Sequence, residues 1–201
     1  MFEREPRRGG LLDVAAGSGI AAGALREQGW DVSALDISEE LVEQIRSRGI
    51  DADLHDLSEG PLPFPDDSFA AVFAGEIIEH LVDTATFLSE LRRVLAPGGV
   101  AVVTTPNLAS FENRLRLLLG RYPMWVEYEL SDQGHVRSYT VPTLRAQLRR
   151  QGFDVEEVVG NWVPFVPQRF LHDVRIPALA RTGDWLPSLA QGLIVRARAL
   201  G

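Results

Sequence analysis

Short apolar runs alternate with longer segments of helical periodicity along most of the chain. The apolar runs are bounded by Gly, Asp or Pro, which is typical of strands buried in a sheet. The segments between them repeat apolar residues every three or four positions, as amphipathic helices do. The predicted strands are Gly10–Val14, Val32–Leu35, Ile50–His55, Ala70–Ala74, Val100–Thr104, Phe153–Val159 and Leu193–Ala199, and the predicted helices are Ile20–Gln28, Ser38–Arg48, Asp83–Leu95, Leu108–Leu119 and Thr140–Gln151.

This alternation predicts an α/β fold with a mostly parallel sheet. Three of the helices begin at residues that favour the N-cap position, namely Ser38, Asp83 and Thr140. The Pro97-Gly98-Gly99 turn is expected to follow the end of the third helix. No internal repeat or linker is visible, so a single domain over residues 1–201 is predicted.

Composition excludes several kinds of chemistry. The 201 residues include no cysteine and no lysine, so all 20 basic residues are arginines. Disulfides, cysteine nucleophiles, Schiff bases and the phosphate-loop lysine are therefore absent. The net charge of −8 argues against a nucleic-acid partner. No apolar run reaches the roughly 18 residues of a membrane helix, so no membrane partner and a cytoplasmic location are expected.

A glycine turn near the start carries the first functional signal. The sequence LLDVAAGSG ends a predicted strand, and Asp36 ends the next one. This is the pattern of the nucleoside-binding half of an α/β domain, in which a strand, a glycine turn and a helix are followed by a second strand that ends in an acid. Gly17 and Gly19 permit close backbone approach to a ligand, and the Asp36 carboxylate can accept from both ribose hydroxyls. The alternative for Asp36 is a turn-forming or helix-capping acid.

The motifs that follow make the pattern more specific. They are DVAAGSG, ALDIS, LPFPDDSFAAVFA, EIIEHL, LRRVLAPGGV, AVVTTPN and HVRSYTVPTLRAQLRRQGF. Together they resemble class I S-adenosylmethionine (SAM)-dependent methyltransferases, in the small-molecule, ubiquinone-pathway-like branch, from Leu11 to Val159. The resemblance implies a doubly wound, Rossmann-like sheet of seven strands in the order 3-2-1-4-5-7-6, with the last strand antiparallel.

The resemblance also implies SAM as cofactor and S-adenosylhomocysteine as its product. Asp13 would help to hold the methionine part, Asp56 would accept from the adenine amino group, and the Leu57 backbone would reach the ring. Alternatively, Asp56 forms a turn before Ser58. Ala15 stands where the family often has glycine, which an alanine can replace if φ is negative. The expected cofactor residues are Asp13, Ala15, Gly17, Gly19, Asp36, Ile37, Asp56, Leu57, Ala74, Gly75 and Glu76.

An acid–histidine set follows the fourth predicted strand. Three interpretations of Glu76, Glu79 and His80, with the more distant His135, stay open. In the first, His80, or alternatively His135, removes the proton of the acceptor. In the second, which is not favoured, the four residues hold a divalent metal ion, as similar sets do in small-RNA and ubiquinone-pathway methyltransferases. In the third, they only contact the cofactor and stabilise the turn.

The acceptor is expected to bind under residues 106–137, a predicted lid or substrate insert, with residues 160–192 as a proline- and aromatic-rich cover. The predicted reaction is methyl transfer from SAM to a small-molecule acceptor at a hydroxyl oxygen, by a monomer or homodimer. Three alternatives are an NAD(P)-dependent oxidoreductase, a non-catalytic SAM-binding module, and a metal-assisted RNA 2′-O-methyltransferase.

Overall fold

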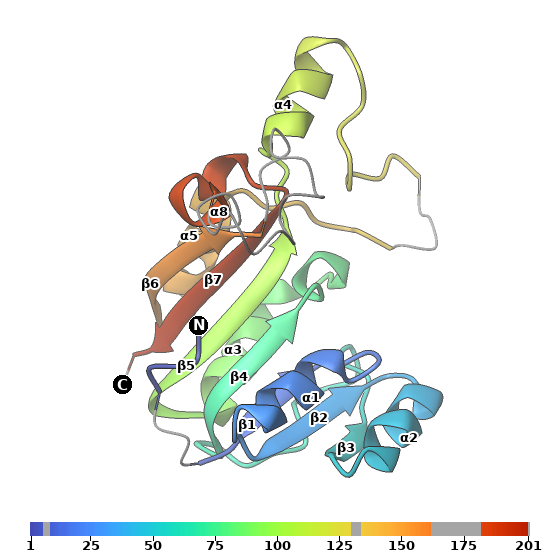
Figure 1. The fold of residues 1–201 in the computed structure, drawn as a ribbon, viewed down its shortest axis with the longest axis vertical. Helices are drawn as coiled ribbons and strands as arrows, with labels where there is room; N and C mark the ends of the chain where they lie inside the picture. The colour runs from blue at the N-terminus through green and yellow to red at the C-terminus, as the bar shows by residue number, and fades with distance from the viewer. Residues whose placement is uncertain (6–8, 130–133, 162–181, 201) are drawn as a thin grey trace, which may run out of the picture.

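The computed structural model describes residues 1–5, 9–129, 134–161 and 182–200. Its seven strands form one sheet in the order β3-β2-β1-β4-β5-β7-β6, in which β7 is antiparallel to both of its neighbours. This is the predicted order and direction (Figure 1). The strands are β1 (Leu11–Val14), β2 (Val32–Asp36), β3 (Asp51–Leu54), β4 (Phe69–Gly75), β5 (Leu95–Pro106), β6 (Phe153–Gly160) and β7 (Gly192–Ala199). The helices are α1 (Ile20–Glu27), α2 (Glu39–Ser47), α3 (Thr84–Val94), α4 (Phe111–Leu118), α5 (Val141–Arg150) and α8 (Thr182–Trp185), with 3-10 turns η1 (Ile78–His80) and η2 (Pro187–Leu189).

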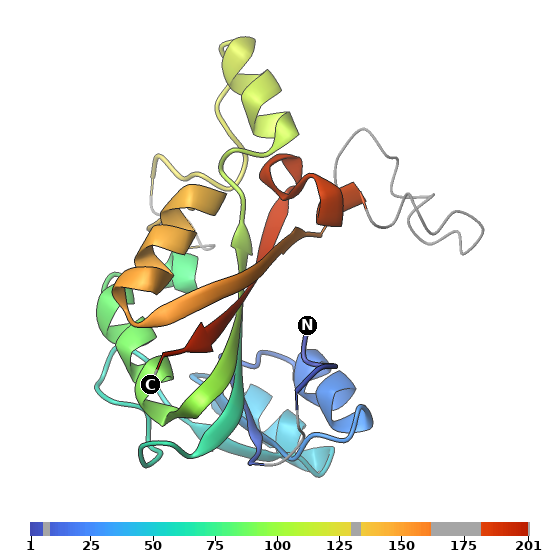
Figure 2. The same cartoon turned by 90° about the vertical axis from the view of Figure 1, so that its left-hand side faces the viewer.

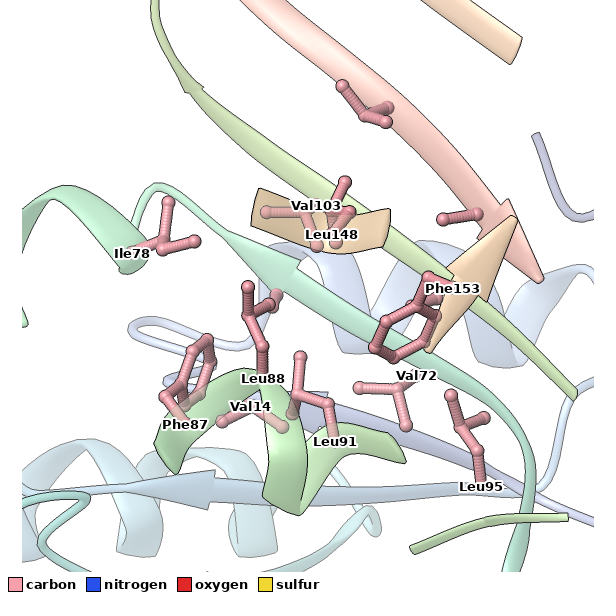
Figure 3. Close-up of a cluster of buried hydrophobic side chains, with 14 of the residues drawn as sticks. Val14, Val72, Ile78, Phe87, Leu88, Leu91, Leu95, Val103, Leu148 and Phe153 are labelled. Carbon is pink, nitrogen blue, oxygen red and sulfur yellow. The ribbon is translucent and has the colours of Figure 1, made fainter. Parts of the chain in front are cut away.

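Helices cover both faces of the sheet (Figure 2). On one face, α1 and α2 pack over β1 and β2, with Ala22, Leu25, Val42 and Ile45 buried. On the other face, α3 and α5 bury their apolar stripes against the strands. Leu88, Leu91 and Leu148 lie there against Val72 and Phe153 (Figure 3). Because parallel strands end at one edge, this packing brings the ends of β1 to β5 together.

The residues that begin the helices act as the sequence predicts. The Ser38 hydroxyl accepts a hydrogen bond from the Leu41 amide at 3.4 Å, and Asp83 accepts one from the Thr86 amide at 3.0 Å. Thr140 begins α5 within a reciprocal capping box. Side-chain caps of this kind stabilise a helix by about 1 kcal/mol each.

The start of β5 differs from the prediction. Helix α3 ends at Val94, and Leu95 already pairs with Phe69 in the sheet. The register then shifts, so that Ala71 pairs with Val100 and the intervening residues of β5 bulge out. The proline–glycine sequence therefore forms an irregularity within a strand instead of a separate turn.

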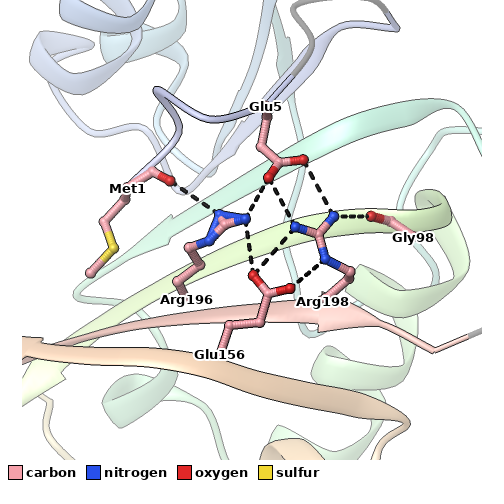
Figure 4. A network of polar contacts seen from close by, with 6 residues as sticks. All are labelled: Met1, Glu5, Gly98, Glu156, Arg196 and Arg198. Atoms are coloured by element: carbon pink, nitrogen blue, oxygen red, sulfur yellow. Dashed lines mark hydrogen bonds and ion pairs between the residues drawn. The ribbon is translucent and has the colours of Figure 1, made fainter.

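An ion-pair network joins the N-terminal residues to the antiparallel end of the sheet (Figure 4). Arg196 on β7 pairs with Glu5 and, at 2.9 Å, with Glu156 on β6. Arg198 donates to the Glu5 carboxylate at 2.9 Å and to the Gly98 carbonyl at 2.7 Å. The Arg196 side chain is only 4% exposed, so its buried charge requires a carboxylate partner, and Glu5 and Glu156 together balance the two arginines.

Helix α4 projects beyond the rest of the molecule in both views (Figures 1 and 2). Only Asn113 of its eight residues is buried. The predicted helix is confirmed, but its leucines are exposed instead of buried in the core. Among the described residues, no helix has both the length and the apolar content needed to cross a bilayer.

Candidate active site

The glycine turn lies between the end of β1 and the start of α1. Ala15 has a φ of +58°, so the condition under which alanine replaces glycine without strain, a negative φ, is not met. A side chain in the left-handed region costs about 1 kcal/mol, which explains why glycine suits this position better. The turn is held by hydrogen bonds from Ala16 N to Leu35 O and from Gly19 N to Ala16 O, both 2.9 Å.

The two glycines of the turn serve different purposes. Gly17 has a φ of +54°, and a Cβ placed there would meet no atom within 4 Å. Gly19 has a φ of +72°, and a Cβ there would lie 2.7 Å from Cγ1 of Ile45 on α2. Gly17 thus leaves open space at the ligand edge, whereas Gly19 permits close packing against a helix.

Asp36 connects the turn to the end of β2. Its Oδ2 accepts from Gly17 N at 2.7 Å, and its Oδ1 accepts from Ser38 N at 2.9 Å. The turn-forming alternative for Asp36 is therefore present in the structure. Each carboxylate oxygen has a second lone pair, so this geometry also leaves acceptors for ribose hydroxyls.

A cavity of about 110 Å³ lies beside Asp36. Its apolar walls suit a flat aromatic ring, and polar groups stand at its rim. Five of the eleven predicted cofactor residues line it: Ala15, Asp36, Ile37, Asp56 and Leu57. The remaining lining residues are Leu35, His55, Ile77 and Leu81.

Asp56 forms the turn before Ser58 that was the alternative to contact with adenine. Its Oδ1 accepts from the Ser58 amide at 2.8 Å and from the Ser58 hydroxyl at 2.7 Å. These hydrogen bonds lower the pKa of the Asp56 carboxyl. The side chain is thus held as a carboxylate at the rim of the cavity, where it can accept from an exocyclic amine.

Asp13 is buried in the centre of the sheet, between Ala34 of β2 and Phe73 of β4. Burial, with the negative Asp36 nearby, raises the pKa of Asp13 to about 7, although the Ala22 amide donates to the carboxylate. Its Oδ2 is buried with no hydrogen-bond partner in the described structure. An orphaned carboxylate oxygen fits a cationic ligand group such as the ammonium of SAM.

Strained backbone recurs where β4 ends. Glu76 has a φ of +52° and follows the predicted cofactor residues Ala74 and Gly75. Its amide donates to Oγ1 of Thr104 on β5 at 3.1 Å, and Thr104 Oγ1 donates to Glu76 Oε1 at 2.6 Å. Strain of this kind persists where neighbouring contacts fix the backbone, as they do at functional sites.

Glu79 lies on η1, the 3-10 turn that follows the end of β4. Its side chain is 1% exposed, and Thr105 Oγ1 donates to its Oε2 at 3.0 Å, but its Oε1 is buried without a partner in the described part of the chain. Burial and the nearby Glu76 raise the pKa of Glu79 to about 7. The Glu79 carbonyl accepts from the amides of Val136 and Arg137, which fixes the segment that carries His135.

These contacts bring the acid–histidine set together. The rings of His80 and His135 meet edge to face with centroids 4.7 Å apart. One ligand atom from each of Glu79, His80 and His135 lies within 4.8 Å of the others. Nδ1 of His135 lies 3.2 Å from the Trp125 carbonyl, which leaves Nε2 free to face a ligand. The set could therefore hold a divalent cation or accept a proton.

A cavity of about 190 Å³ contains this set. Glu76, Glu79, His80 and His135 all line it, so the structure brings these four predicted residues together around one cavity. Sequence reasoning missed two kinds of residue here: the supporting Thr104 and Thr105, and Asn161 and Gln191 from the far end of the chain. Trp125, an aromatic residue expected either to line an acceptor pocket or to pack the lid, lines this cavity with a strained φ of +63°. The two threonines were visible in AVVTTPN, but nothing local signalled Asn161 or Gln191.

A third cavity shares lining residues with each of these two. It measures about 400 Å³ and shares Leu57 and Leu81 with the small cavity beside Asp36 and His80 with the cavity of the acid–histidine set. A larger hollow of about 590 Å³, between Met1–Arg4 and β6, contains none of the predicted site residues. The candidate site is therefore the series of cavities at the carboxyl edge, where open α/β sheets bind ligands.

Comparison with known proteins decides the family. A family model described as a methyltransferase domain matches residues 1–158. The chain belongs to this family. It is a class I SAM-dependent methyltransferase domain, and the match decides against the NAD(P)-dependent oxidoreductase alternative.

Individual relatives agree with this assignment. A probable SAM-dependent methyltransferase of Mycolicibacterium smegmatis is 33% identical over 75% of this chain and 54% of its own length. A ubiquinone biosynthesis O-methyltransferase of Xylella fastidiosa is 29% identical over 75% of this chain and 63% of the relative. The chain thus spans about half to two thirds of these relatives. The fold also matches a SAM-dependent methyltransferase of Mesorhizobium loti with a TM-score of 0.66 at 23% identity, covering 96% of this chain and 93% of that one.

Proposed function

We propose that this protein transfers the methyl group of SAM to a hydroxyl oxygen of a small-molecule acceptor. The observation that carries the proposal is the position of the acid–histidine set. It lines a cavity at the exit of β4, on the same edge of the sheet as the smaller cavity that Ala15 and Asp36 line. SAM supplies an activated methyl group with a good leaving group. The protein must then align the acceptor and remove its proton.

The residues divide into two groups in this proposal. Asp36 and the Leu57 backbone bind the nucleoside, and the buried Asp13 carboxylate faces the cationic methionine part. His80 or His135 accepts the proton of the acceptor hydroxyl, because a neutral imidazole is a suitable base near pH 7. The relatives include an O-methyltransferase, which supports an oxygen acceptor.

Transfer from labelled SAM to pools of small hydroxylated compounds tests this proposal. We expect His80→Ala or His135→Ala to reduce transfer about 10²-fold or more, while the SAM dissociation constant stays within about twofold. Full transfer by both variants would contradict the assignment of the base. SAM binding without transfer to any acceptor would favour the non-catalytic module, and salt-sensitive RNA binding would favour the RNA 2′-O-methyltransferase.

A second candidate is a metal-assisted form of the same reaction. The convergence of Glu79, His80 and His135, with an unpaired buried oxygen on Glu79, favours it. A divalent cation at these atoms would polarise the acceptor hydroxyl. Calorimetry with Mn²⁺, which accepts nitrogen and oxygen ligands, would then show one site that Glu79→Gln weakens. Full transfer after EDTA treatment, with no Mn²⁺ binding, would exclude this candidate.

A further inference from the structure

The position of His135 depends on a segment that forms no helix or strand. Residues 134–138 lead from the predicted lid into α5 and are irregular in the described structure. His135 nevertheless meets His80 edge to face, with ring centroids 4.7 Å apart. Because an irregular segment is held only by its contacts, the geometry of the histidine pair depends on what attaches this segment to η1.

Backbone contacts make the first part of this attachment. The Glu79 carbonyl accepts from the amides of Val136 at 2.9 Å and Arg137 at 3.0 Å. A Cβ built on Gly134, whose φ is +63°, would lie 3.7 Å from His80 Nδ1. Both ends of the segment therefore lie against the turn that carries His80.

The Arg137 side chain makes the second part. Its Nε donates to the Leu81 carbonyl at 3.1 Å, and its Nη2 donates to the Val82 carbonyl. A guanidinium presents its donors in a rigid planar fork, so binding to two successive carbonyls sets both the distance and the orientation of the segment. Hydrogen bonds from a charged donor are also stronger than those from a neutral one.

These contacts of Arg137 with Glu79, Leu81 and Val82, which we call the clasp, enclose the histidine pair. His80 lies between Glu79 and Leu81, whose carbonyls both accept from Arg137, and His135 lies two residues before the arginine. Displacing a positioned group by about 1 Å can cost 10²-fold in rate. The clasp therefore lies where it can control the reactivity of both histidines.

From these contacts we propose that Arg137 is a positioning residue that joins the segment of His135 to the turn of His80 and so sets the geometry of the base. Arg137 acts through the two histidines and not on the reacting atoms. Its role in transfer rests on the proposed function, in which His80 or His135 accepts the proton. The clasp itself is a structural property that can be measured without any acceptor.

Nuclear magnetic resonance of the whole protein with labelled histidine tests the clasp directly. The chain has four histidines, so few ring signals need assignment. We expect a nuclear Overhauser effect between the rings of His80 and His135 in the wild type. Arg137→Ala should lose this effect while its circular dichroism spectrum is retained. Persistence of the effect in Arg137→Ala, or its absence in the wild type, would overturn the proposal.

Transfer from labelled SAM to pools of small hydroxylated compounds tests the consequence. Arg137→Ala should lower the rate at saturating SAM about tenfold or more, because the base is misplaced, while the SAM dissociation constant stays within about twofold. Arg137→Lys keeps the charge but lacks the planar fork, so it should not restore the rate. A full rate in Arg137→Ala, or rescue by Arg137→Lys, would overturn the positioning role.

Arg145→Ala provides the matched control. Arg145 is an exposed arginine on α5, so this variant loses the same charge and keeps the clasp. The ring contact should persist, and transfer should stay within about twofold of the wild type. Equal losses in the two alanine variants would overturn a specific role for Arg137. Full transfer by both His80→Ala and His135→Ala would instead remove the base assignment, and the ring contact would still decide whether the clasp exists.

Discussion

At the scale of single residues, the site combines strained backbone with buried acids. Three of the four non-glycine residues with positive φ in the described structure, Ala15, Glu76 and Trp125, line the candidate cavities. Each is held by a hydrogen-bonded neighbourhood, so the strain is maintained by the surrounding fold. The sequence identified Ala15 as irregular. The sign of its φ could not be predicted, because the turn is held by a long-range hydrogen bond from the next residue, Ala16 N, to Leu35 O of β2.

Relieving the strain at Ala15 should stabilise the protein. We expect Ala15→Gly to raise the free energy of unfolding by about 0.5–1 kcal/mol, because glycine adopts the left-handed region without penalty. Ala16→Gly is the matched control, since Ala16 has no positive φ and packs against the core, and it should lower stability. Urea denaturation measures both. A loss of stability in Ala15→Gly would contradict the strain argument.

The pKa of Asp13 predicts a pH-dependent stability. The folded state keeps the Asp13 proton up to about pH 7, whereas the unfolded chain releases it near the ordinary aspartate pKa of 3.8. This contribution therefore stabilises the fold at low pH and is lost as the pH rises from about 4 through 7. Asp13→Asn should show a smaller fall in Tm between pH 5 and pH 8 than the wild type. An equal fall in Tm in the wild type and in Asp13→Asn would refute Asp13 as the origin of the pH dependence.

At the scale of elements, the sequence predicted strands, helices and caps where local signals decide them. Ser38, Asp83 and Thr140 cap their helices because a side-chain oxygen within three residues is sufficient. Contacts that are distant in sequence were harder to predict. The early start of β5 depends on pairing with Phe69, and the exposure of α4 depends on Asn113 bonding Met124.

We expect the ion pairs at β7 to hold the N-terminal segment against the sheet. Glu5→Ala removes a carboxylate that pairs with both Arg196 and Arg198, so we expect stability to fall by about 1–3 kcal/mol and amide exchange of residues 2–5 to accelerate. Glu3→Ala is the control, because Glu3 is exposed on the same segment and should change stability by less than about 0.5 kcal/mol. Equal effects of the two substitutions would disprove a specific role for the network.

At the scale of the whole molecule, one sheet edge collects residues from the entire chain. Asp13 and Asp36 come from the first two strands, His80 follows β4, and Gln191 precedes β7. The resemblance predicted the strand order correctly, because the order is a property of the fold, and the order places the ends of β1, β2 and β4 at this edge. The predicted cover, residues 160–192, falls largely outside the described structure, so its role stays a prediction.

The central claim is that this edge binds SAM through the Asp36 carboxylate. Isothermal titration with SAM tests it in the wild type, in Asp36→Asn, and in Asp51→Asn, an exposed acid at the start of β3 that serves as the control. We predict saturable binding by the wild type and the control, and a loss of about tenfold or more in Asp36→Asn, because one charged acceptor of the ribose hydroxyls is removed. No saturable binding by the wild type, or equal affinity in Asp36→Asn, would contradict the claim.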